Sequence, residues 1–171
     1  MLTPSELIKL LNNRGYDYDF HQHNALFTVE DSNKHRGEIK GLHSKNLFIK
    51  NKKNKFYLFS CEEFSKINLK TISKSLNLGN VSFAKKEYLL ELLGINPGSV
   101  TPFALLNNIE NNIDLYLEDK MYESEYINFH PLTNKATVTI KSKEFIEFMI
   151  ENKKKVHIFS TSSETIVKTY G

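Results

Sequence analysis

Apolar and polar positions alternate along this chain with two periods, and each period predicts its own kind of element. At the start, Thr3 can cap a helix, Pro4 suits its first turn and Glu6 can complete a capping box. The apolar positions that follow repeat at helical spacing: Leu7, Leu10, Leu11. We therefore expect a first helix that ends near Gly15.

The middle of the chain carries the clearest strand signal. Two apolar runs at residues 47–49 and 56–59 flank a polar turn at residues 51–54, which predicts a β-hairpin. An extended segment is expected at residues 16–22. Apolar runs that predict further strands occur at residues 113–117, 126–129, 136–140 and 156–159.

Other stretches predict helices. A short helix is expected from Thr28 towards Gly37. Three more are expected around residues 69–76, from Ser82 to a stop at Gly94, and from Ser142 onwards. Because helices and hairpin-linked strands are interspersed, we expect an α/β (α+β) fold: a mixed, partly barrel-like sheet surrounded by helices.

Length and composition favour one soluble domain. The chain has 171 residues and no long linker, repeat or low-complexity block, so we expect one domain over residues 1–171, with a loosely packed tail at 161–171. The net charge is +3, from 23 basic and 20 acidic residues. This balance permits RNA binding, but an ordinary solvated surface has it as well.

Cys61 is the one cysteine, so an intramolecular disulfide and a cysteine zinc cluster are both excluded. The first residues lack the basic and apolar regions of a signal peptide, and no window approaches the roughly 18 apolar residues of a membrane helix. We expect a cytoplasmic protein.

The stretch at residues 41–50 is the first candidate for chemistry. Lys45 and Asn46 place a cation and an amide at adjacent positions of an expected strand, next to His43. Neighbours on a strand point to opposite faces, so at most one of the two enters a pocket unless the strand bends. A solvated strand edge, where lysine is common, is the alternative.

Two further segments are candidates. One is a Gly-x-x-x-Pro loop, where glycine lets backbone approach a ligand and proline stiffens the exit; it comprises Gly98, Ser99, Val100, Thr101 and Pro102. The other holds His130, kept extended by the proline that follows it, and Asn134. A tight connection and a structural histidine are the alternatives.

Several common motifs are missing. The histidines show no HxxxH or HExxH spacing, and the chain contains no GxGxxG, no GxxxxGK[ST] and no GxSxG. The usual zinc-protease site, the nucleotide loops and the hydrolase nucleophile elbow are therefore excluded.

Taken in order, four segments resemble the prolyl-tRNA editing proteins of the YbaK/ProX superfamily, relatives of the insertion domain of bacterial prolyl-tRNA synthetase. The segments are residues 41–50, 82–84, 90–103 and 128–137. The resemblance runs from about Thr3 to Phe159. Lys45-Asn46 is similar to the pair in free-standing alanyl-tRNA(Pro) deacylases, whereas the cysteinyl-tRNA(Pro) branch usually has Lys-Thr.

The resemblance implies a role for each candidate. Lys45 contacts the anionic or electron-rich part of the aminoacyl end, and Asn46 donates or accepts a hydrogen bond with the ester or the terminal ribose. The Gly98 loop holds the amino group or carbonyl, and His130 orders the terminal nucleotide or the attacking water. The remaining substrate-binding candidates are Phe27, Val29, His43 and Asn134.

The implied function is trans-editing, the hydrolysis of alanine from mischarged proline tRNA without a metal or other cofactor. The implied partners are that tRNA and, transiently, prolyl-tRNA synthetase. A deacylase for serine or cysteine on tRNA and a non-catalytic tRNA-binding module remain the alternatives.

Overall fold

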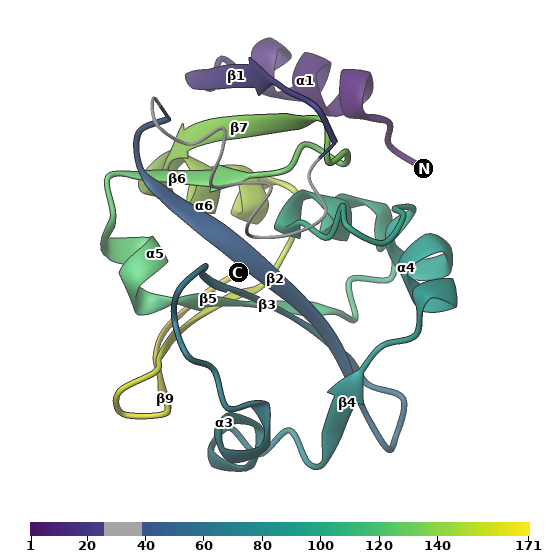
Figure 1. Cartoon of the computed structure of the whole chain (residues 1–171), viewed down its shortest axis with the longest axis vertical. Helices are drawn as coiled ribbons and strands as arrows, with labels where there is room; N and C mark the ends of the chain where they lie inside the picture. Colours follow the sequence, from purple (N-terminus) through teal and green to yellow (C-terminus); the bar gives the residue numbers. More distant parts are fainter. Residues whose placement is uncertain (26–38) are drawn as a thin grey trace.

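A computed structural model of the protein describes residues 1–25 and 39–171. It shows a mixed nine-stranded sheet flanked by helices (Figure 1), which confirms the expected fold class. The strands are β1 (Tyr18–Gln22), β2 (Leu42–Asn51), β3 (Phe56–Glu62), β4 (Val81–Phe83), β5 (Asp114–Glu118), β6 (Tyr126–Phe129), β7 (Ala136–Lys141), β8 (Val156–Ser160) and β9 (Thr165–Tyr170). The helices are α1 (Pro4–Asn13), α3 (Leu69–Ser75), α4 (Lys86–Leu93), the 3-10 helix η1 (Pro102–Asn107), α5 (Asp119–Glu123) and α6 (Ser142–Glu151).

The long strand β2 links the two halves of the sheet. The strand order is β1-β7-β6-β2-β3-β5-β8-β9, and β4 pairs with the end of β2. β2 is parallel to β6 and antiparallel to β3 and β4. In Figure 1 it crosses the molecule between the group β1, β7 and β6 and the group β3, β5, β8 and β9. A strand in this position can present residues to both groups.

Two apolar cores lie on opposite faces of the sheet. The larger one contains Phe48, and the smaller one, beside α3, contains Ile49. Because side chains alternate along a strand, these neighbours on β2 face different cores. The alternation therefore identifies the face on which each more polar residue of β2 lies.

Helix α1 begins as its sequence predicts. The Thr3 backbone N–H donates to Glu6 Oε2 at 2.7 Å, and the Glu6 N–H donates to Thr3 Oγ1 at 3.3 Å. This reciprocal pair satisfies two N–H groups that have no partner within the helix.

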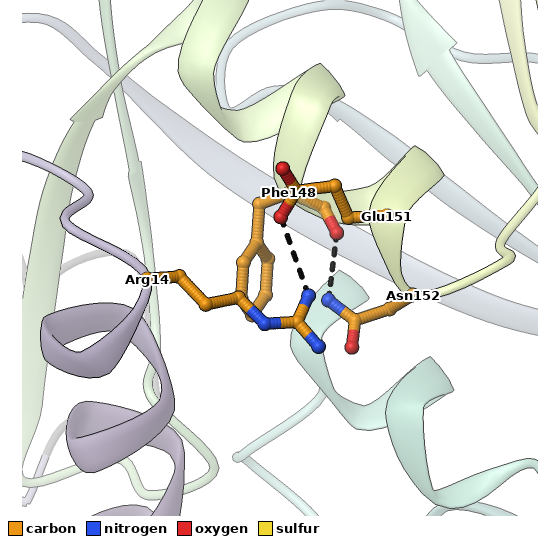
Figure 2. Close-up of polar contacts among 4 residues, drawn as sticks. All are labelled: Arg14, Phe148, Glu151 and Asn152. Carbon is orange, nitrogen blue, oxygen red and sulfur yellow. Dashed lines mark hydrogen bonds and ion pairs between the residues drawn. The ribbon is translucent and has the colours of Figure 1, made fainter.

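The end of α1 contacts the end of α6 (Figure 2). Arg14 Nη1 lies 3.3 Å from Glu151 Oε2, and the Asn152 side chain donates to the Phe148 carbonyl at 2.7 Å. The Tyr16 ring also packs edge-on against Phe148, with 5.4 Å between ring centroids. A half-exposed ion pair contributes about 1 kcal/mol or less, and the edge-on ring pair contributes about 0.5–1.5 kcal/mol beyond the area that it buries.

The expected helix start at Ser82 differs from the structure. Ser82 does not cap a helix: it lies in β4, and α4 begins four residues later, at Lys86. The pairing of Ser82 with Lys50 on β2 outweighs its capping tendency. The expected helix from Thr28 towards Gly37 lies outside the described residues.

The tail at residues 161–171, for which loose packing stays a prediction, forms a turn followed by the edge strand β9. β9 pairs antiparallel with β8, from Val156↔Tyr170 to Ser160↔Thr165. Most of its side chains are exposed, which explains why its sequence lacks a buried-strand pattern. None of the helices in the described ranges has the length and apolar character needed to cross a membrane.

Candidate active site

The candidate site lies where β2 separates from β6. The two strands pair in parallel only at Leu42↔Ile127 and His43↔Asn128. On the same edge of β2, the next pairing is with β4, at Ile49↔Phe83. Between these points, no strand in residues 1–25 and 39–171 covers that edge. β2 thus has an open half, residues 42–46, of which only Leu42 and His43 pair with β6, and a closed half, residues 47–51.

Asn128 and Gly41 fix the entry of β2 beside β6. The buried Asn128 amide donates to the carbonyls of Lys40 and Leu42, at 2.9 and 3.2 Å, and its oxygen accepts from the Thr139 hydroxyl at 2.5 Å. Gly41 has a φ of +86°, and a Cβ there would collide with the Tyr126 carbonyl. Only glycine combines this conformation with so close an approach.

Lys45 lies on the face of β2 that carries the smaller core. It pairs with Cys61 on β3, and its Nζ donates to the carbonyl of Ser65 in the loop after β3. The side chain is half-buried. An ammonium has three donors, so two N–H groups remain for a substrate.

Asn46 lies on the opposite face, as strand alternation predicts. Its Oδ1 accepts from the Ser60 hydroxyl at 2.5 Å, and its Nδ2 donates to the Ser44 hydroxyl at 3.2 Å. The Ser44 hydroxyl donates in turn to the Asn128 carbonyl at 2.9 Å, so Asn46 is connected to β6 through Ser44. These bonds orient the amide and leave it one further N–H and one lone pair.

The backbone of Asn46 faces the open edge. The Phe48 carbonyl accepts from the Ala84 N–H at 2.9 Å on this side, and the His43 carbonyl accepts from Glu63 on the other. Peptide groups alternate between the two edges of a strand, so the N–H and C=O of Asn46 point the same way as those of Phe48. A ligand at this edge can reach that N–H and the side chains on both faces.

His130 follows the last residue of β6. Asn128, two residues before His130, pairs with His43, two residues before Lys45, in the last parallel pair of β2 and β6. His130 Nδ1 lies 3.0 Å from the Ala136 carbonyl, which can only accept, so Nδ1 carries the proton and Nε2 keeps a lone pair. Burial, and then the charge of His23, lower the pKa of His130.

The turn after His130 is held in an uncommon conformation. Leu132 has a φ of +63°, and its side chain is buried. A left-handed conformation costs a leucine roughly 1–2 kcal/mol. Packing of this side chain, which the larger core includes, offsets that cost. His130 is therefore anchored on both sides, by β6 and by a packed turn that also contains the buried Asn134.

The loop at residues 98–102 connects α4 to η1. Gly98 is exposed with a φ of +88°, and Ser99 N–H donates to the Asn96 carbonyl at 3.1 Å, as in a tight β-turn. Thr101 is fully buried, and its hydroxyl has no hydrogen-bond partner among the described residues. A buried hydroxyl without a partner is uncommon and is suited to bond a ligand or a water.

Packing brings this loop towards His130. The next residue of η1, Phe103, lies edge-on to Phe129, with 5.9 Å between centroids, and Phe129 directly precedes His130. Val100 packs against the same core.

The predicted residues thus divide into three groups. His43 and Lys45 share one face of β2, Asn46 lies on the other, and His130 follows Phe129 of β6, whose ring packs against Phe103 just after the loop. Phe27 and Val29, the expected pocket walls, lie outside the described residues.

A set of buried polar residues that the sequence did not single out supports Lys45 and Asn46. Ser60 is a polar residue inside an apolar strand, and Glu118 is a charged residue at the end of another. Both are buried and hydrogen-bonded. A polar residue on an otherwise apolar strand was the available signal, but its partner is distant in sequence.

The chain matches the family model of the aminoacyl-tRNA editing domain over residues 23–148. It is 38% identical over 133 residues to the prolyl-tRNA synthetase associated domain-containing protein 1 of Xenopus laevis, covering 75% of this chain and 79% of that protein. It is 26% identical to the prolyl-tRNA editing protein ProX of Acetoanaerobium sticklandii, covering 85% and 90%.

The fold is similar to solved structures. A crystal structure of a candidate trans-editing enzyme for prolyl tRNA synthetase superposes with a TM-score of 0.67, at 19% identity, over 91% of this chain and 96% of that one. At this identity the likeness concerns the fold alone. The family match covers most of the chain, from the end of β1 into α6, and contains every candidate residue of the site. The protein therefore belongs to the aminoacyl-tRNA editing domain family, the YbaK/ProX family that its sequence resembles.

Proposed function

We propose that this protein is a free-standing trans-editing enzyme that hydrolyses the ester between alanine and the terminal ribose of proline tRNA. Membership of the editing family makes it an aminoacyl-tRNA hydrolase that corrects errors of prolyl-tRNA synthetase. The alanine substrate rests on the Lys45-Asn46 pair. The observation that supports the proposed site is the uncovered edge of β2 after His43, where the Lys45 and Asn46 side chains lie on the two faces of the strand.

Each group has a role in ester hydrolysis. Water attacks the alanyl carbonyl carbon, the carbonyl oxygen becomes an oxyanion, and the tRNA ribose oxygen then leaves with a proton. Lys45 and the Asn46 N–H groups are donors suited to the oxyanion and the ribose oxygens. Nε2 of neutral His130 can accept a hydrogen bond from the attacking water and orient it.

Size explains why such an enzyme is needed. Alanine is smaller than proline, so the synthetase cannot exclude it sterically, and each missing methylene gives only about 1–3 kcal/mol of discrimination. An editing pocket too small for proline can hydrolyse the alanyl ester that the synthetase forms in error and leave the prolyl ester intact. In our proposal the loop at residues 98–102 binds the amino group or carbonyl, His43 and Asn134 contribute further substrate contacts, and Phe27 and Val29 wall the pocket.

A panel of charged tRNAs tests the proposal. The purified protein is incubated with proline tRNA carrying alanine, proline, serine or cysteine, and release of each amino acid is followed. We expect alanine to be released fastest and proline to be retained. Preferred release of serine or cysteine would reassign the substrate, and salt-dependent binding without release would indicate a tRNA-binding module. Co-sedimentation with prolyl-tRNA synthetase, with and without tRNA, tests the transient association.

A further inference from the structure

Behind Lys45 lies a buried carboxylate, that of Glu118, the last residue of β5. Glu118 is fully buried. Its Oε2 accepts from the Glu62 N–H at 2.7 Å, and its Oε1 accepts from the Ser65 hydroxyl at 2.7 Å and from Thr161 at 3.3 Å. These donors come from the end of β3, the loop after it and the turn between β8 and β9. A buried carboxylate is costly unless hydrogen bonds satisfy it, and here three neutral donors do so.

Ser65 links Glu118 to Lys45. Its hydroxyl donates to Glu118, and its carbonyl accepts from the Lys45 ammonium. Ser65 is itself buried, at 6% exposed. One residue therefore contacts the carboxylate through its side chain and the cation through its backbone. The position of the Lys45 ammonium depends on where Glu118 holds the Ser65 loop.

The thiol of Cys61 reports on the same two charges. Cys61 pairs with Lys45 in the register of β2 and β3. Burial raises the pKa of this thiol; the charge of Glu118 raises it further, whereas that of Lys45 lowers it. The charges of Glu118 and Lys45 therefore both act on the buried Cys61 thiol. Lys120 adds a second cation, with Nζ 3.5 Å from the Ser65 hydroxyl.

The opposite end of β5 offers a matched comparison. Asp114, its first residue, is partly buried and lies 3.1 Å from His157 Nε2. This carboxylate is paired with a neighbouring strand and has no link to β2 through Ser65. Substituting each of the two carboxylates on this strand therefore distinguishes an effect on stability from an effect on the candidate site.

We propose that Glu118 is a positioning residue for Lys45, acting through Ser65 to hold the ammonium at the open half of β2. This inference rests on the proposed function for the substrate that Lys45 meets. Glu118 itself touches neither the substrate nor the reacting atoms. Its contribution is to the geometry of Lys45, and a displacement of about 1 Å can cost a hundredfold in rate.

The test is a set of double-mutant cycles. Glu118→Gln, Ser65→Ala and the control Asp114→Asn are made in the wild-type protein and in Lys45→Ala. For each variant, kcat and KM on alanyl-tRNA(Pro) and the midpoint of thermal unfolding are measured. In the wild-type background, we expect Glu118→Gln and Ser65→Ala to lower kcat about tenfold to a hundredfold, with KM little changed. Asp114→Asn should leave kcat unchanged.

The Lys45→Ala background separates positioning from general damage. If Glu118 acts through Lys45, neither Glu118→Gln nor Ser65→Ala lowers the residual rate further. A loss of the same size in both backgrounds would overturn the proposal, as would wild-type kcat in both of the folded variants. Ser65→Ala keeps the carbonyl that holds Lys45 and removes the hydroxyl that bonds to Glu118, together with its longer contacts to Glu62 and Lys120. It therefore tests the link should Glu118→Gln fail to fold.

A second readout does not depend on turnover. Labelling of Lys45 by an amine-acylating reagent, followed by mass spectrometry, should be faster in Glu118→Gln and Ser65→Ala than in Asp114→Asn, because the freed ammonium becomes more accessible. Equal labelling rates would contradict the positioning role. Absence of deacylation by the wild-type protein would instead contradict the proposed function and leave the labelling comparison to decide this inference.

Discussion

The open and closed halves of β2 belong to one strand but have different roles. In the closed half, Phe48 and Ile49 are buried in separate cores, and β4 covers the edge. In the open half, His43, Lys45 and Asn46 are only half-buried, and β6 separates from β2 directly after His43. The closed half fixes the strand, and the open half uses that rigidity to hold polar groups beside an uncovered edge.

This difference indicates how a small fold can hold a site on a strand. Rigid packing a few residues away positions side chains more accurately than a loop would. Supporting bonds then orient each polar group: Ser60 and Ser44 for Asn46, and Ser65 for Lys45. Substitutions in the open half should therefore change the rate, and those in the closed half should change stability.

The largest effect is expected for Lys45→Ala. Removing the cation from the open half should lower kcat on alanyl-tRNA(Pro) by about a hundredfold to a thousandfold, the size seen when a charge-stabilising donor is lost. The unfolding midpoint should change little. The control is Lys143→Ala, an exposed lysine on α6. Equal rates for the two variants would place the chemistry elsewhere.

Ile49→Ala, in the closed half, should lower the stability of the protein and leave its catalytic rate nearly unchanged. The side chain is fully buried, so truncation should lower the free energy of unfolding by about 2–5 kcal/mol. Denaturant unfolding measures the loss. At a temperature where the variant remains folded, kcat should stay within a few-fold of wild type. A loss of rate as large as that of Lys45→Ala would show that the halves are not separable.

His130 should give the open half a pH dependence. Burial holds the pKa of His130 below its ordinary value of 6.5. Neutral His130 therefore contributes stability that is fully present above pH 6.5 and is lost as the pH falls through the folded pKa. Over the same range Nε2 loses its lone pair, so kcat should fall by about tenfold per pH unit at the acid end.

In the variant His130→Asn, kcat should no longer fall at the acid end of the pH–rate profile, and the rest of that profile should be unchanged. Single-turnover rates from pH 5 upwards, corrected for spontaneous ester hydrolysis, measure it. A limb that lies above pH 6.5, or one that persists in the variant, would assign the ionisation to another group.

The smallest effect is expected for Ser60→Ala. It removes the hydroxyl that orients Asn46 and should reduce kcat a few-fold, in line with the roughly 1 kcal/mol of one hydrogen bond. The same substitution in an Asn46→Ala background should have no further effect on the rate. A loss of equal size in both backgrounds would mean that Ser60 acts on the packing of β3 and not through Asn46.

Local patterns predicted most elements but not all of them. β6 occupies residues 126–129 as expected, because its apolar run is short and bounded. β2 begins at Leu42, before the expected strand start around Lys45 and Asn46, since its first residues are polar and lack a buried-strand pattern. β9 was missed because its side chains are exposed. In each case the missing information is the pairing with another strand, which the local sequence does not contain.

The candidate site shows the same limit. Alternation correctly predicted that Lys45 and Asn46 lie on opposite faces, but not that an uncovered edge makes both accessible. The bond from Ser65 to Glu118 joins residues 53 positions apart. Such contacts follow from the order of strands in the sheet, so the fold was required before the support of Lys45 could be recognised.

The most direct test of the account is single-turnover hydrolysis with saturating enzyme, comparing alanyl-tRNA(Pro) with prolyl-tRNA(Pro) for the wild-type protein and Lys45→Ala. The account predicts rapid release of alanine by the wild-type protein, little release of proline, and loss of alanine release in the variant. Release of both amino acids at equal rates, or full activity of Lys45→Ala, would contradict it.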